Sequence, residues 1–248
     1  MTITTALLLF LAGLFSGMIN AIAGGGTFLT FGAMTLAGVP PISANATSSI
    51  VQFPGYITSA LAYWSEIRRE WKAVAVLSAI SLFGSLGGAL WLLSLSNPAF
   101  SSLVPWLLIA ATALFAAGPY LKPRASGEHP PNSLRGNALQ FVTSIYGGFF
   151  GAGMGVMMLA SLSLATGGDY HRLNAIKNGL SIVIAAVAIL VFTAGGAISW
   201  KHGLVMLPGA GLGGWMGVWF ARRVPQGVLR WLVIAIGLFL AGYYFVRG

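Results

Sequence analysis

The sequence predicts an all-α integral membrane protein made of two inverted-topology repeats, each with a glycine-broken re-entrant helical hairpin and three transmembrane helices. Three observations support this prediction. Of 248 residues, 57% are hydrophobic and 7% are charged, a composition that no water-facing surface can have. The charges divide the chain into apolar stretches long enough for membrane helices. The two halves of the chain also match each other in sequence.

The composition excludes several other classes of protein. The formal net charge of +9 arises from 13 Lys and Arg against only 4 Asp and Glu, so we expect no nucleic-acid partner. The sequence contains no Cys, which excludes disulfides and thiolate metal sites, and we expect neither a metal nor a cofactor. The N-terminal run MTITTALLLFLAG lacks the basic start of a secretory signal, which favours an uncleaved first membrane segment.

Hydropathy, with charges as boundaries, gives eight apolar stretches along the chain. They lie at about 5–22, 27–38, 42–64, 72–95, 101–121, 137–168, 173–197 and 201–246. Most can cross about 30 Å of hydrocarbon at about 1.5 Å per residue. Alternation with period 2 is absent, so we predict helices and not barrel strands. The sixth and last stretches are compound, and Arg222, Arg223 and Pro225 divide the last one in two.

The hydrophilic segment KPRASGEHPPNSLRG, residues 122–136, separates a first membrane repeat (1–121) from a second (137–248). A shift of 129 residues without a gap aligns these halves and pairs two dipeptides. These are Asn45-Ala46 with Asn174-Ala175 and Trp71-Lys72 with Trp200-Lys201. The same shift also pairs glycines: Gly24 with Gly153, Gly26 with Gly155, Gly38 with Gly167, Gly84 with Gly213 and Gly88 with Gly217. Internal duplication in a polytopic membrane protein is typical of transporters whose site lies between two repeats.

The distribution of positive charge distinguishes two topologies. If each glycine cluster forms the tip of a re-entrant hairpin, only Lys201 and Arg247 of the 13 basic residues fall near the outer face. If each cluster interrupts a simple span, the basic residues divide 8 against 5. The positive-inside rule favours the first topology, with the linker in the cytoplasm and both termini outside. Each repeat then crosses the membrane an odd number of times, which inverts the second repeat.

Glycine clusters at membrane depth mark the first candidate site. Irregular backbone in hydrocarbon survives only where it is buried in protein or lines a wet cavity. An apolar helix is predicted to begin after each cluster, at Thr27 and at Val156, and helix N-termini attract anions. The substrate-binding candidates here are Gly24, Gly25, Gly26, Thr27, Gly153 and Gly155. The alternative is that these glycines serve helix packing, which is our prediction for the GxxxG-spaced Gly84/Gly88 and Gly209/Gly213/Gly217.

Polar residues at the head of the next helix of each half form the second candidate site. They are Asn45, Thr47, Ser48 and Gln52 in the first half and Asn174, Lys177 and Asn178 in the second. Pairs three residues apart share a helix face and could line a cavity. Lys177 precedes an apolar run, where a cation is costly unless it snorkels to the interface or meets an anion. Ordinary helix-to-helix hydrogen bonds are the alternative for the hydroxyl residues.

The sequence lacks the residues that an enzyme acting within the membrane would need. His129, His171 and His202 all fall in or near loops, which removes the base for an intramembrane serine nucleophile. No H-E-x-x-H motif and no pair of acids is present. We therefore expect a protein that is not an enzyme.

The run GLFSGMINAIAGGGTFLTFGAMTLAGVPPISANATSS resembles the signature of the sulfite exporter family, the TauE/SafE-type anion transporters. The second half departs from this pattern, with GAGMG in place of a glycine run and NAIKNG where the first half reads NATSSI. The resemblance covers nearly the whole chain. It implies a multi-pass protein of the plasma (inner) membrane whose partners are membrane lipid and a small anionic substrate.

The function that the resemblance implies is secondary export of sulfite, sulfoacetate or a related organosulfonate. We expect the anion gradient and the membrane potential to drive this export. Two alternatives stay open: an anion channel, which two inward helix ends could also serve, and a proton-coupled transporter of another small organic anion.

Overall fold

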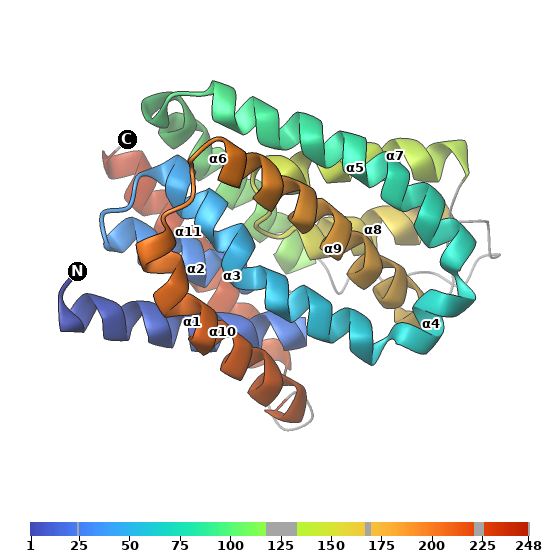
Figure 1. Ribbon diagram of the computed structural model, residues 1–248, viewed down its shortest axis with the longest axis horizontal. Helices are drawn as coiled ribbons and strands as arrows, with labels where there is room; N and C mark the ends of the chain where they lie inside the picture. Colours follow the sequence, from blue (N-terminus) through green and yellow to red (C-terminus); the bar gives the residue numbers. More distant parts are fainter. Residues whose placement is uncertain (24, 118–132, 167–169, 221–225, 248) are drawn as a thin grey trace.

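The computed structural model describes residues 1–23, 25–117, 133–166, 170–220 and 226–247, and these residues form helices without strands (Figure 1). Gly24 and most of the predicted linker, residues 122–132, lie outside the described residues. The helices are α1 (Ile3–Ala23), α2 (Thr27–Leu36), α3 (Pro41–Ala62), α4 (Trp64–Arg69), α5 (Trp71–Ser94), α6 (Asn97–Ala117), α7 (Leu134–Phe149), α8 (Met154–Thr166), α9 (Tyr170–Ala194), α10 (Trp200–Phe220) and α11 (Gln226–Arg247).

The helices have the length and composition of a polytopic membrane protein. Four apolar segments of the described chain are long enough to span a bilayer: Ile3–Asn20, Trp71–Ser94, Asn97–Leu114 and Arg172–Ala194. Large apolar side chains on their outer faces are exposed, among them Phe83 and Trp106. Such exposure would be unstable in water, but it matches a surface that faces lipid. The predicted class, an all-α integral membrane protein, agrees with this architecture.

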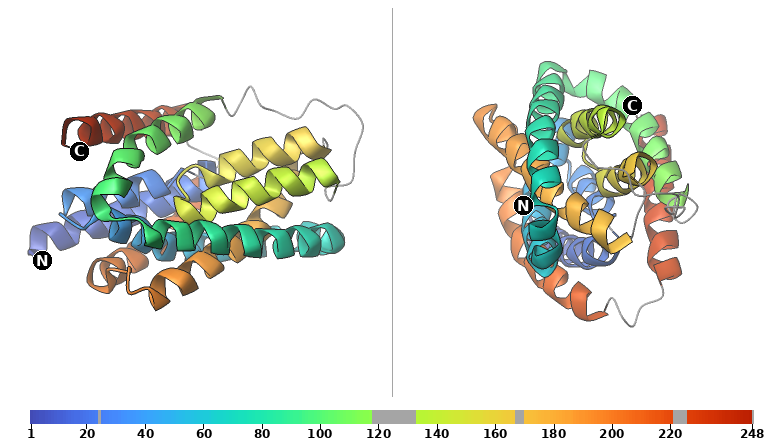
Figure 2. Two further views of the ribbon diagram at one scale, coloured as in Figure 1. Left: turned by 90° about the horizontal axis from the view of Figure 1, so that it is seen from above. Right: turned by 90° about the vertical axis from the view of Figure 1, so that its right-hand side faces the viewer.

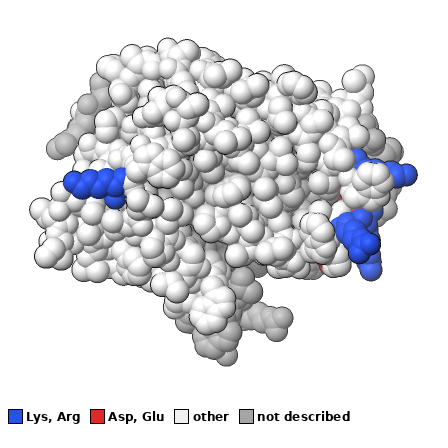
Figure 3. All heavy atoms as spheres, in the orientation of Figure 1, with Lys and Arg blue, Asp and Glu red and all other residues white. Residues whose placement is uncertain are grey.

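Positive charge gathers at two opposite ends of the molecule. On the face drawn in Figure 3, a broad uncharged band separates the Lys and Arg side chains at these ends. One end is where α4 lies in Figure 1, and Arg68, Arg69 and Lys72 belong to it. We call it the α4 end; the chain's two termini lie at the other end (Figures 1 and 2).

Each predicted glycine break lies between two helices that pack on one another. The first break lies between α1 and α2, and α2 begins at Thr27 as predicted. The second joins α7 to α8, but α8 begins at Met154, two residues before the predicted Val156. The short helix α4, between α3 and α5, was not predicted. It lies where charged residues end the apolar stretch of α3.

The two halves are interlocked rather than side by side. Helix α1 packs along α10, and α7 packs along α5, so the first helix of each half lies against the other half. A shift of 129 residues relates these two pairs of helices to each other. Glycines line both contacts: a Cβ on Gly84 would lie 2.8 Å from the carbonyl oxygen of Phe141, and one on Gly213 would overlap that of Leu14. The packing role predicted for Gly84, Gly88, Gly209 and Gly213 is confirmed.

Candidate functional site

A cavity lies between the two halves of the chain, at the glycine breaks. It is partly open, and the empty space of about 280 Å³ at this site includes space outside the enclosed part. Helices α2 and α3 contribute one part of its lining, and α7, α8 and α9 contribute the other. The lining residues are Thr27, Ser48, Ser49, Gln52, Tyr56, Gly147, Gly151, Met154, Ile184 and Ala185. Thr27 is the first residue of α2 and Met154 the first of α8, so a helix N-terminus from each half opens on this cavity.

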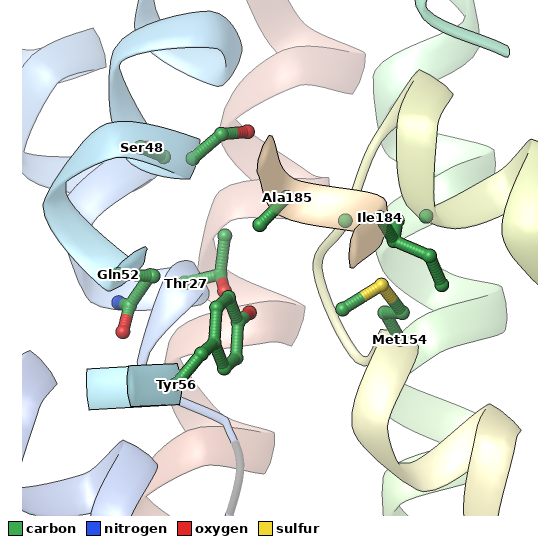
Figure 4. A pocket seen from close by; sticks show the side chains of 10 residues that line it. Thr27, Ser48, Gln52, Tyr56, Met154, Ile184 and Ala185 are labelled. Carbon is green, nitrogen blue, oxygen red and sulfur yellow. The ribbon is translucent and has the colours of Figure 1, made fainter. Parts of the chain in front are cut away.

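The two walls of the cavity differ in chemistry. The five lining residues of the first half all carry a hydroxyl or an amide, whereas those of the second half are glycine, alanine, isoleucine or methionine. Figure 4 shows Thr27, Gln52 and Tyr56 on one side and Met154 and Ile184 on the other. None of the lining residues is charged. An anion in this cavity would therefore be held by dipoles and hydrogen bonds and not by an ion pair.

The first break is fixed by a chain of buried hydrogen bonds. Ser16 on α1 donates its hydroxyl proton to the carbonyl of Gly26 at 2.7 Å. The amide of Gln52, on α3, donates in turn to the hydroxyl oxygen of Ser16. Gly26 has an ordinary helical φ of −60°, so its backbone conformation does not require glycine. Glycine is required here because α1 passes close to it. A Cβ there would overlap the backbone oxygen of Ser16.

The second break uses glycine for a different reason. Gly151 and Gly153 have φ of 74° and 75°, in the left-handed region that L side chains rarely adopt. The hydroxyl of Tyr146, on α7, donates to the carbonyl of Ala152 at 2.6 Å and fixes the turn. Gly155 has neither constraint, because the nearest atom to a Cβ would be Cδ of Lys177 at 3.7 Å.

Some of the polar residues predicted for the site lie away from the cavity and make bonds between helices. Asn45 is buried, and its side-chain amide donates to the carbonyl of Phe149, at the end of α7, at 2.9 Å. The hydroxyl of Thr47 donates to the carbonyl of Ser43 and accepts the backbone N–H of Ser199 at 2.9 Å. These two residues hold α3 to the second half of the chain.

The candidates on α9 form a separate group near the cavity. Lys177 lies beside Gly155, next to the start of α8, but does not line the cavity. Ile184 of the cavity follows seven residues later, which is two helical turns or about 10 Å. Asn178 is buried and Asn174 is partly exposed, and neither is among the lining residues. Lys177 therefore stands between the cavity and the α4 end, where α9 begins.

Of the predicted residues, Thr27, Ser48 and Gln52 line the cavity. The predicted glycines lie next to it: Gly25 and Gly26 are buried directly before Thr27, Gly153 lies in the turn between α7 and α8, and Gly155 follows Met154. Gly24 falls outside the described residues. The most informative residue that the sequence analysis missed is Tyr56. It follows Ser48 and Gln52 at four-residue steps, so helical spacing could have identified it.

The site offers a limited set of hydrogen-bond donors to an anion. The hydroxyl of Ser48 is directed to the carbonyl of Ala44 at 2.8 Å, and the amide of Gln52 is directed to Ser16. The cavity also has the hydroxyls of Thr27 and Tyr56. Most N–H groups in the first turns of α2 and α8 already donate to the carbonyls of the glycines at the two breaks, so these helix ends act on an anion mainly through their dipoles. Among the described residues, no group of three His, Cys, Asp or Glu lies together as a metal site would require.

Comparison with known proteins gives relatives along almost the whole chain. The profile of the family described as "Sulfite exporter TauE/SafE" matches residues 9–244. The chain is 25% identical over 233 residues to a "Probable membrane transporter protein" of Haemophilus influenzae, which covers 94% of this chain and 91% of that protein. It is 27% identical over 233 residues to "Probable membrane transporter protein ORF9" of a Sinorhizobium species, covering 94% and 89%. It is 26% identical over 235 residues to "Probable membrane transporter protein YfcA" of Escherichia coli, covering 92% and 85%.

Proposed function

The chain belongs to the TauE/SafE sulfite exporter family, and we propose that it exports a small sulfur-containing anion across the plasma membrane. Its relatives are named as membrane transporters, so the chain is a multi-pass membrane transporter and not an enzyme. The substrate, the membrane and the driving force are the parts that we propose.

One observation carries the proposal: the N-termini of α2 and α8, one from each half, open on the same cavity. The dipole of a helix is positive at its N-terminus. This holds although most first-turn N–H groups of α2 and α8 already donate to carbonyls at the glycine breaks. Two such ends facing one cavity favour a negatively charged ligand. The hydroxyls of Thr27 and Tyr56 add donors that suit a sulfonate or sulfite oxygen.

The contrast between the cavity walls favours an organosulfonate, such as sulfoacetate, over inorganic sulfate. The polar first-half wall suits an oxyanion group, and the Met154 and Ile184 side chains opposite suit a short carbon chain.

We also propose that the halves are inverted repeats with re-entrant hairpins. The equivalence of the α1–α10 and α7–α5 contacts under the shift of 129 residues supports this arrangement. In Figure 2, α1 starts from the end that carries the termini, whereas α7 starts from the opposite end. The greater number of described basic residues at the α4 end favours that end as the cytoplasmic one.

Binding to the purified protein tests the substrate class. A ligand that binds only the folded state stabilises it by about 2.7 kcal/mol at 100 times its dissociation constant. We expect sulfoacetate and sulfite to raise the melting temperature more than sulfate, thiosulfate or acetate do. Tyr56→Phe, which removes a cavity hydroxyl, should reduce this rise. Thr58→Val, a change of similar size at an exposed position of the same helix, should not.

Flux in proteoliposomes then separates a carrier from a channel. A carrier saturates with substrate and is accelerated by substrate on the far side of the membrane, whereas a channel shows no such acceleration. We expect saturation and acceleration. A set of sulfur anions that neither stabilises the protein nor crosses the membrane would refute the proposed function.

A further inference from the structure

Ser16 and Gln52 form a relay between two helices and the N-terminus of a third. Gln52 is on α3, Ser16 is on α1, and the carbonyl that Ser16 holds belongs to Gly26, which immediately precedes α2. Both residues are almost fully buried, with 0% of the surface of Ser16 and 2% of that of Gln52 exposed. A buried polar group is costly unless it is hydrogen-bonded, so this chain of bonds, from Gln52 to Ser16 and from Ser16 to the carbonyl, defines a specific arrangement.

The carbonyl of Gly26 is also part of α2 itself. It accepts the backbone N–H of Leu29 at 3.0 Å and that of Thr30 at 3.4 Å, which are the bonds of the first helical turn. The next residue, Thr27, lines the cavity. The position of this carbonyl therefore fixes where the N–H groups and the positive end of α2 point.

Gln52 lines the cavity, but its amide is directed away from the opposite wall. Figure 4 shows the amide turned away from Met154 and Ile184, on the opposite wall, and its nitrogen donates to Ser16. One of the two N–H donors of this amide is thus used within the protein, and the amide group as a whole is directed away from the opposite wall.

We infer that Ser16 and Gln52 are positioning residues, which hold the N-terminus of α2 toward the anion through the carbonyl of Gly26. This inference rests on the proposed function, and it assigns Gln52 a role through Ser16 in place of direct contact with the substrate. The relay belongs to one half only. The shift of 129 residues places Ile145 and Ser181 at the equivalent positions, and among the described residues the buried hydroxyl of Ser181 has no partner.

A double-mutant cycle on the purified full-length transporter distinguishes the two roles. The probes are sulfite and methanesulfonate, and the variants are Ser16→Ala, Gln52→Leu and both together. We expect Ser16→Ala to weaken binding about tenfold, as loss of one hydrogen bond near a charge predicts. The double variant should bind no more weakly than Ser16→Ala alone, because Gln52 acts through Ser16. Ser102→Ala removes an exposed serine that also donates to a carbonyl of its own helix, and it should bind as wild type.

Hydrogen exchange provides a second readout that needs no ligand. Ser16→Ala should accelerate amide exchange in a peptide that covers α2 and leave α8 unchanged, whereas general destabilisation would affect both. Additive effects of Ser16→Ala and Gln52→Leu on affinity would overturn the inference, because Gln52 would then contact the anion itself. Unchanged affinity or unchanged exchange in Ser16→Ala would also overturn it. If wild type binds neither probe, the proposed function fails, while the exchange result still decides whether the relay holds α2.

Discussion

Arg172 and Glu70 form an ion pair that joins the two halves at the α4 end, with Nε 2.8 Å from Oε1 and Nη2 3.3 Å from Oε2. The shift of 129 residues places Ser199 at the position of Glu70 and Ser43 at that of Arg172. There Thr47 links both residues: it accepts the N–H of Ser199 and donates to the carbonyl of Ser43. The same junction is thus ionic at the α4 end and neutral at the other.

Loss of one junction should change access to the cavity from that side only. We expect Glu70→Ala to accelerate labelling of Met154→Cys from the α4 side several-fold, because the pair that holds α9 at this end is gone. Thr47→Val should accelerate labelling from the opposite side. Inside-out and right-side-out vesicles measure the two rates, and the absence of native Cys leaves one reactive thiol. Equal labelling from both sides in both variants would show that these contacts do not control access.

The glycines of the breaks should differ in their tolerance of a side chain. Gly26→Ala should destabilise the protein strongly, since its Cβ would overlap Ser16, and Gly153→Ala should cost about 1–2 kcal/mol for its left-handed backbone. Gly155→Ala should fold as wild type, because its Cβ has room. Thermal unfolding in detergent measures all three. A Gly155→Ala variant less stable than Gly26→Ala would contradict the geometry.

Lys177 should contribute to anion affinity from beside the start of α8. We expect Lys177→Met to weaken sulfite binding about tenfold and Lys177→Arg to retain part of the affinity, because a charge near the path to the cavity attracts the anion. Titration at low and at high salt checks this, since screening should reduce the difference between wild type and Lys177→Met. Equal affinity of the two proteins at low salt would assign Lys177 to the membrane interface.

Single cysteines at the two ends should report the orientation of the protein. Ser65 on α4 and Ser96 between α5 and α6 are both exposed. If the α4 end is cytoplasmic, an impermeant maleimide should label Ser96→Cys in intact cells and Ser65→Cys only after permeabilisation. The reverse pattern would invert the proposed direction of the repeats.

Transport should follow the membrane potential more than the pH gradient. The acidic residues that the structure describes are Glu66 and Glu70, and both belong to the α4 end and not to the cavity. An inside-negative potential drives a monoanion outward by about 2.3 kcal/mol per 100 mV. Flux of methanesulfonate, whose charge is constant with pH, should therefore persist without a pH gradient. Flux that requires the pH gradient at zero potential and is lost in His171→Ala would identify a proton-coupled carrier.

The sequence predicted the half of the cavity that carries polar groups. Thr27, Ser48 and Gln52 are unusual in an apolar chain, and the first glycine cluster marks the break before Thr27. The opposite wall, with Met154 and Ile184, has no chemical signature that separates it from ordinary membrane helix. Asn45 was also predicted to bind substrate, but its side chain bonds the carbonyl of Phe149 on α7. In a sequence, a polar side chain that bonds another helix cannot be distinguished from one that lines a cavity.

The interlocking of the halves also lay beyond sequence patterns, since hydropathy gives spans but not their neighbours. The α1–α10 and α5–α7 contacts both depend on glycines that bring two backbones together. The GxxxG spacing of these glycines predicted close packing, but it did not indicate which helix each one packs against.

The contact between α1 and α10 sets a delay during synthesis of the chain. Gly13 and Gly17 of α1 pack on backbone atoms of Met206 and Ala210, so the partner of the first helix is made almost last. At about 5–20 residues per second, α1 waits in the bilayer for roughly 10 to 40 s after it leaves the ribosome. During this interval its small-residue face is open to other nascent helices and to membrane proteases. Slowing translation between α1 and α10 should therefore lower the yield of assembled transporter, while the same pause after α11 should not.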